Sequence, residues 1–190
     1  MGIASHQLKG SVRGALICAF FGSAWMYWAV AFSGYPSPLR FSIVTVTAIA
    51  LVAWVILRVR AMRHRLSSAI ELEHRIDLRT FFWVDFGIES VLAGVGAFAL
   101  ARLGRFDLIP QALGVIIGLH FIPLGKIFHA PHYYWTGGIM LGAALGSLFI
   151  HHGYIRNVVE CGAIGLTLWG TAIAILFWKS SAVSDQTGRT

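Results

Sequence analysis

The chain has 190 residues, of which 57% are hydrophobic and only 12% charged, and its mean hydropathy is +0.72. A soluble domain carries about 25% charged residues. This composition excludes an ordinary soluble domain and indicates an integral membrane protein. The net charge of +7 would raise nucleic acid as a partner in a soluble protein. Here the basic residues lie between apolar segments and no nucleic-acid-binding motif is present, so we expect no nucleic-acid partner.

Six apolar segments are long enough to cross a lipid bilayer as helices, since a helix needs about 20 residues to span the hydrocarbon core. Because they show no strand-like alternation, we predict an all-α fold: one transmembrane domain, residues 1–190, built as a bundle of six helices. Breaks that contain proline or glycine separate the segments, among them 34–38 and 129–132. The predicted spans are 14–33, 41–59, 80–103, 108–127, 133–151 and 155–178.

The charges of the loops predict the orientation. With six spans, eleven basic residues lie on the side of the two termini and four on the opposite side. By the positive-inside rule, both termini are then cytoplasmic, and we expect the protein in the cell membrane of a bacterium. Most of the bias comes from the predicted cytoplasmic loop 58–79. Its basic half would attract anionic lipid, although a role as a topology anchor explains the same charges.

One alternative concerns the first segment. Lys9 and Arg13, an apolar run, and then Ala29 and Ala31 follow the order of a cleavable signal peptide. Because the rest of the chain is already membrane-embedded, we expect an uncleaved first helix.

Ionisable side chains interrupt the apolar segments, and charge inside a bilayer is costly enough to mark candidate functional sites. Asp85 and Glu89 stand four residues apart in the third segment, so they share one helix face. His120 lies at a similar depth in the fourth segment, because consecutive helices run antiparallel. We therefore expect Asp85, Glu89 and His120 to form an inner group, with His129 and His132 at its cytoplasmic mouth.

Three roles fit this inner group. A carboxylate and an imidazole can handle protons or cations, because histidine changes charge near neutral pH. The same residues can bind a divalent metal, although their spacing matches no established metal motif. They can also form a structural polar contact that joins two helices.

Each role corresponds to a different function. Proton or cation handling predicts a small permease or channel for an ion or small molecule, which is the leading hypothesis. Metal binding would instead predict a membrane-embedded enzyme directed at lipid. A structural contact would predict a non-catalytic accessory or sensor protein. No cofactor other than this metal is predicted.

A second group lies toward the outer face. His151 and His152 end the fifth segment, Arg156 begins the sixth, and Glu160 stands one turn further in. Arg156 and Glu160 are spaced i, i+4, so we expect a simple salt bridge between them in preference to a site.

Glycines at four-residue spacing let helix backbones approach closely. Gly138, Gly142 and Gly146 form one such row, and Gly114 and Gly118 form another. We expect both rows to pack inside the bundle, although a seam between copies of a homo-oligomer would have the same spacing.

The two halves of the chain invite comparison, because Val84-Asp85-Phe86-Gly87 and Val159-Glu160-Cys161-Gly162 place an acid at matching positions. With three spans per half, the halves would be antiparallel, as in inverted-repeat transporters. A three-plus-three inverted repeat is therefore a further hypothesis for this fold.

The stretch Gly118-Leu119-His120-Phe121-Ile122-Pro123-Leu124, followed by Tyr134-Trp135-Thr136-Gly137-Gly138, resembles a family of small, uncharacterised bacterial membrane proteins. The resemblance covers two of the six predicted helices. It implies a multi-pass membrane protein of bacterial type, and it implies no activity and no site.

Overall fold

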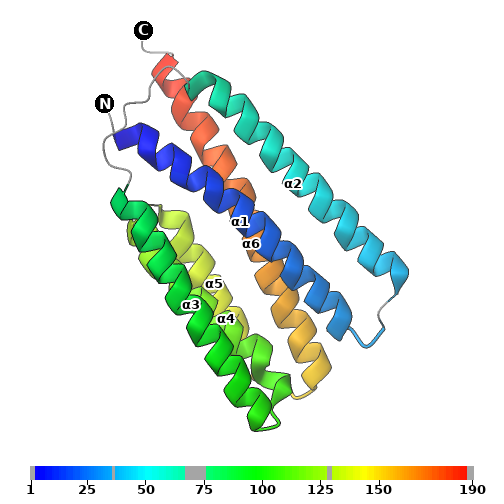
Figure 1. The fold of residues 1–190 in the computed structure, drawn as a ribbon. Coiled ribbons are helices and arrows are strands. Elements are labelled where there is room, and N and C mark those ends of the chain that lie inside the picture. Colours follow the sequence, from blue (N-terminus) through cyan, green and yellow to red (C-terminus); the bar gives the residue numbers. More distant parts are fainter. Residues whose placement is uncertain (1–2, 36, 67–75, 128–129, 188–190) are drawn as a thin grey trace.

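The computed structural model describes residues 3–35, 37–66, 76–127 and 130–187. The described part is all-α, a bundle of six long helices and one short 3-10 helix (Figure 1). Side chains are described for most of it, but not for 3–13, 61–66, 76–83 and 178–187, nor for Val59, Asp85 and Ile127. The elements are α1 (Ile3–Phe32), α2 (Pro38–Leu66), α3 (Ile76–Arg102), η1 (Phe106–Leu108), α4 (Ile109–Ile127), α5 (Pro131–Ser147) and α6 (Gly153–Thr187).

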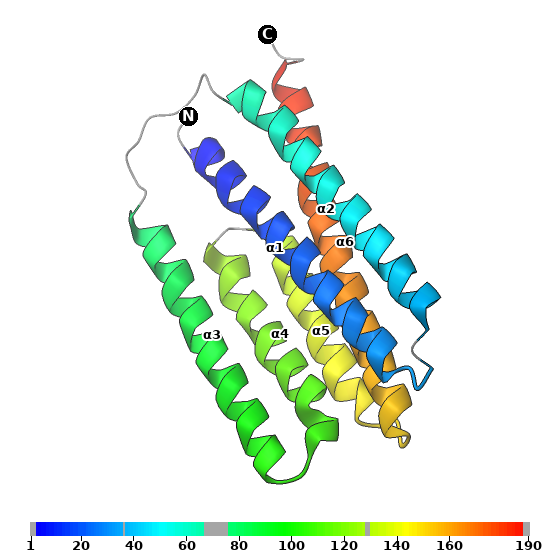
Figure 2. The same ribbon diagram turned by 45° about the vertical axis from the view of Figure 1, so that its right-hand side comes forward.

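Consecutive helices run antiparallel, so α1 and α6 both have their free ends at the same end of the bundle (Figure 1). The order of packing differs from the order in the chain. Helix α1 packs on α6 and on α2, α5 packs between α6 and α4, and α3 packs on α4. Figure 2 shows the result, with α2 at one edge of the bundle and α3 at the other.

Within the described residues, four helices contain stretches long and apolar enough to cross a membrane. Helices α3 and α5 lie alongside them in the same bundle (Figure 2). Large apolar side chains such as Phe20, Phe98 and Trp135 are exposed on the outside of the bundle, as expected where lipid replaces water. The four candidate spans are Gly14–Phe32, Pro38–Arg58, Phe106–Lys126 and Gly153–Phe177.

The helix ends follow the turn residues of the sequence. Gly104 has φ +69°, and the backbone N–H groups of Gly104 and Arg105 donate to the carbonyls of Ala101 and Leu100. This is a Schellman motif, in which glycine accepts the left-handed conformation that ends a helix. Pro38 and Pro131 stand at the first positions of α2 and α5, where a missing N–H does no harm.

The predicted loop 58–79 is partly helical. Helix α2 continues to Leu66 and α3 begins at Ile76, while residues 67–75 lie outside the described part of the chain. The physical reason is that residues 58–66 contain no proline or glycine and are rich in arginine, which favours helix. The predicted span 41–59 agrees with the apolar stretch Pro38–Arg58, and α2 extends beyond it.

Glycines mark the closest approaches between helices. Gly22 of α1 meets Gly165 of α6, where an added Cβ on either residue would lie 3.0 Å from the other's carbonyl oxygen. Gly118 of α4 meets Gly137 of α5 in the same way. Such contacts bring backbones together, which is how helices associate in lipid.

The row of Gly138, Gly142 and Gly146 does not pack inside the bundle, contrary to the sequence prediction. All three are exposed, and a Cβ added at any of them would meet nothing within 4 Å. Gly114, by contrast, faces the interior. The four-residue spacing identifies a smooth helix face but not the direction in which that face points.

The packing does not confirm the inverted repeat. Helix α5 packs on α6, whereas the described part of α3 contacts only α4 and η1 and has no contact with α2. The corresponding helices of the two halves therefore have different neighbours.

Candidate functional site

Glu89 and His120 face each other between α3 and α4. Their Oε2 and Nε2 atoms are 3.4 Å apart, and both side chains are largely buried. Glu89 stands midway along α3, and His120 is close to the middle of α4. These two residues, the inner pair, therefore place a carboxylate and an imidazole in the central layer of the bundle.

A shallow groove of about 150 Å³ opens beside the inner pair. Its walls are apolar, and it lies at the packing seam between α3 and α4. Glu89 and His120 are therefore partly accessible from the side of the bundle, through this groove. The lining residues are Ile88, Glu89, Leu92, Ile116, Leu119 and His120.

The structure describes the remaining members of the predicted inner group only in part. Asp85 belongs to α3, but its side chain is outside the described part, and His129 lies outside the described residues altogether. His132 is in the first turn of α5, with its ring 4.6 Å from that of Tyr133. Among the described residues, no three His, Cys, Asp or Glu side chains form a group that could hold a metal ion.

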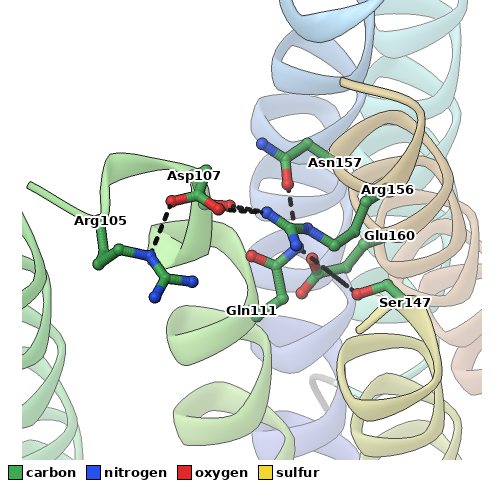
Figure 3. A network of polar contacts seen from close by, with 7 residues as sticks. All are labelled: Arg105, Asp107, Gln111, Ser147, Arg156, Asn157 and Glu160. Carbon is green, nitrogen blue, oxygen red and sulfur yellow. Dashed lines mark hydrogen bonds and ion pairs between the residues drawn. The ribbon is translucent and has the colours of Figure 1, made fainter. Parts of the chain in front are cut away.

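A second cluster of polar side chains lies at the opposite end from the termini, where α4, α5 and α6 meet (Figure 3). Gln111 of α4 donates from Nε2 to Asn157 Oδ1 at 2.9 Å, and the same nitrogen is 3.5 Å from Ser147 Oγ. Ser147 Oγ lies 3.4 Å from Glu160 Oε2. We call Gln111, Ser147, Asn157 and Glu160 the outer network; all four are buried, and Glu160 is completely inaccessible.

The predicted salt bridge between Arg156 and Glu160 is wrong. Arg156 Nη2 instead donates to Asp107 Oδ2 at 2.6 Å and to the Asp107 carbonyl at 3.1 Å. Asp107 also accepts from Arg105 at 3.4 Å. The i, i+4 rule considers one helix alone, and here η1 brings a more exposed carboxylate to the guanidinium.

Glu160 fits inside because α4 has a glycine opposite it. A Cβ at Gly114 would lie 2.8 Å from Glu160 Oε1, 2.9 Å from Ile164 Cδ1 and 3.0 Å from Ala144 Cβ. One carboxylate oxygen therefore rests against the α4 backbone among apolar neighbours. The other oxygen points toward Ser147.

The two predicted outer histidines are not part of this network. His151 and His152 are exposed in the turn between α5 and α6. The carbonyl of His152 accepts from the backbone N–H of Arg156 at 2.9 Å, so it helps to start α6.

Sequence reasoning missed Asp107, Gln111, Ser147 and Asn157. Gln111 carries a usable signal, because it is an uncharged polar residue in a long apolar run. The pairing of Asp107 with Arg156 had no such signal, since 49 residues separate them.

Comparisons of the chain with models of protein families, with curated proteins and with solved structures found no match.

Proposed function

We propose that the chain is a six-span protein of a bacterial cell membrane, with cytoplasmic termini, that acts as a small proton- or cation-handling permease. The observation that supports this most directly is the 3.4 Å contact between His120 Nε2 and Glu89 Oε2. It places two titratable groups at the middle of two apolar helices, where transporters hold their coupling ions.

The chemistry suits proton transfer. A carboxylate and an imidazole at this separation can share or exchange one proton, and an imidazole changes charge near neutral pH. The groove beside the pair leaves it partly accessible at the seam between α3 and α4. The proposal of six spans is supported by α3 and α5 lying alongside the four helices that meet the length and composition of a span.

A second candidate function is that of a non-catalytic accessory protein, and one observation favours it. The described part of α3 packs only on α4 and η1, so the inner pair is a polar contact at the main attachment of that helix. In this case the pair holds α3 in place and moves no proton.

Proton flux in reconstituted vesicles tests the first proposal. The protein is reconstituted with a pH-sensitive dye inside, and a potassium diffusion potential drives protons inward. We expect wild-type vesicles to acidify faster than protein-free vesicles, and Glu89→Gln to reduce the rate to that of protein-free vesicles, because the amide cannot take up a proton. Ser90→Ala is the matched control, since the neighbouring Ser90 is exposed and its hydroxyl donates to the Phe86 carbonyl of its own helix.

The result separates the two candidates. Equal flux through wild type and Glu89→Gln contradicts the permease proposal. Absence of wild-type flux, together with a lower unfolding temperature for Glu89→Gln, supports the accessory role.

A further inference from the structure

The groove beside the inner pair lies on the outside of the bundle. All of its lining residues belong to α3 or α4, and Ile88, Leu92 and Leu119 each have more than half of their surface exposed. Helix α3 forms one edge of the bundle, so no further helix of the described structure covers this seam (Figure 2). In a membrane-embedded bundle the groove therefore faces lipid.

The groove combines apolar walls with a group that can be negatively charged. Its lining side chains are aliphatic apart from those of Glu89 and His120. These two remain 15% and 10% exposed, so the atoms of a ligand can touch them. With a neutral imidazole, the inner pair carries the single negative charge of the carboxylate. The groove is therefore complementary to a single positive charge attached to an apolar body.

Two other cations match the groove less well. An inorganic cation takes several oxygen ligands, whereas this lining offers one carboxylate and one imidazole among aliphatic side chains. The amine of a phospholipid stays at the membrane surface, but Glu89 stands midway along the 27 residues of α3, about 20 Å from either end. An organic cation dissolved in the bilayer needs no set of oxygen ligands and reaches this depth.

The size of the groove limits the charged end of such a ligand. A volume of about 150 Å³ holds roughly five groups as large as a water molecule, which is enough for a trimethylammonium group and its first methylene. A shallower hollow of about 450 Å³ adjoins the groove along α3 and shares Ile88 and Leu92 with it. Its other lining residues, Val84, Gly87 and Val91, are also apolar, so an alkyl tail can lie there.

We propose that the inner pair and its groove bind a lipophilic organic monocation, an ammonium with an apolar tail, which enters from the bilayer between α3 and α4. Glu89 supplies the negative charge, and the aliphatic side chains contact the carbons next to the nitrogen. The inference rests on the proposed function, since it names the substrate class of the proposed permease. Binding is measured without transport, so the two proposals can fail separately.

Equilibrium dialysis tests the binding. Radiolabelled hexyltrimethylammonium is dialysed against phosphatidylcholine vesicles with and without the protein, and the difference gives the probe bound to protein. We expect saturable binding to wild type and an affinity about tenfold lower in Glu89→Gln, because the amide has no charge. Ser90→Ala, at the exposed residue next to Glu89, should keep the wild-type affinity. The neutral isostere of the probe, with carbon in place of nitrogen, should compete poorly.

A second variant keeps the inner pair intact and covers the case in which Glu89→Gln does not fold. Leu119→Trp enlarges one wall of the groove and should weaken binding of the probe, because the indole fills the space. Leu119 is 51% exposed, so the larger side chain does not overpack the core. Leu145→Trp on α5 is the matched control, since Leu145 is 52% exposed and lies outside the groove.

Three results overturn the proposal. The first is binding to wild-type vesicles no greater than to protein-free vesicles. The second is unchanged affinity in both Leu119→Trp and a folded Glu89→Gln. The third is equal competition by the probe and its neutral isostere, which would show that the charge is not recognised. Proton flux is scored separately: flux without probe binding contradicts this inference alone, and probe binding without flux contradicts the permease alone.

Discussion

Glu89 and Glu160 are both carboxylates within apolar helices, and they compensate their burial in different ways. Glu89 lies against an imidazole on the neighbouring helix and beside a groove. Glu160 is completely buried among neutral polar groups and leaves one oxygen without a donor. The structure thus separates a carboxylate with a titratable partner from one held among neutral polar side chains.

Gly114 should be essential to the position of Glu160. In Gly114→Ala the added Cβ would lie 2.8 Å from Glu160 Oε1 and about as close to two apolar atoms, so the carboxyl group or α6 must move. We expect this overpacking to lower the free energy of unfolding by about 1–3 kcal/mol. Denaturation by SDS in mixed micelles measures this loss.

Gly170→Ala is the matched control on α6, because Gly170 is exposed and a Cβ there meets nothing within 4 Å. Alanine is the better helix former, so this variant should be neutral or more stable by about 0.5–1 kcal/mol. Equal losses in the two variants would show that space opposite Glu160 is not limiting.

At the scale of residues, the sequence predicts how far along the bundle a residue lies better than it predicts which side chain the residue contacts. Residue counts along antiparallel helices put Glu89 and His120 at one level, and their side chains are in fact 3.4 Å apart. The partner of Arg156 could not be predicted, because it depends on where η1 lies relative to α6. Local spacing describes neighbours within one helix only.

At the scale of elements, α3 is the least supported long helix in the described structure. It contacts α4 and η1, whereas α6 contacts α1, α2, α4, α5 and η1. Much of the apolar surface of α3, including Val91, Val95 and Phe98, is exposed. Few packing contacts indicate a low free energy for local opening.

Hydrogen exchange should reveal this difference. In detergent, we expect the backbone amides of α3 to exchange about tenfold faster than those in the middle of α6, since local opening breaks fewer contacts. Mass spectrometry of peptides from the two helices gives both rates in one sample. Equal protection would indicate that α3 has a partner beyond the contacts seen here.

Helix boundaries could be predicted from the sequence, but the faces of the helices could not. All six segments correspond to helices, and Pro38, Gly104, Pro131 and Gly153 stand at or beside helix ends. Which side faces inward is a different problem, because lipid and protein interior are both apolar and the usual alternation of polar and apolar faces disappears. For this reason the row Gly138, Gly142 and Gly146 was assigned to the wrong side of α5.

At the scale of the whole molecule, the orientation in the membrane is testable by labelling. Tyr35 follows α1 and His152 precedes α6; both are exposed, and these two connections lie at the end of the bundle opposite the termini (Figure 1). Lys126 is exposed in the last turn of α4, at the other end of that helix. With cytoplasmic termini, an impermeant maleimide should label Tyr35→Cys and His152→Cys in intact cells, but not Lys126→Cys. Background should be low, because Cys18 and Cys161 are buried. Labelling of Lys126→Cys with protection of the other two would reverse the orientation.

The most extensive packing in the bundle joins its first and last helices, α1 and α6. Ala15, Cys18 and Ala19 of α1 and Ile164, Leu168 and Ala172 of α6 belong to one buried cluster. During synthesis, α1 enters the membrane long before α6 leaves the ribosome. The inward face of α1 must therefore contact lipid or a helper protein first, and the core can form only after α6 has been synthesised.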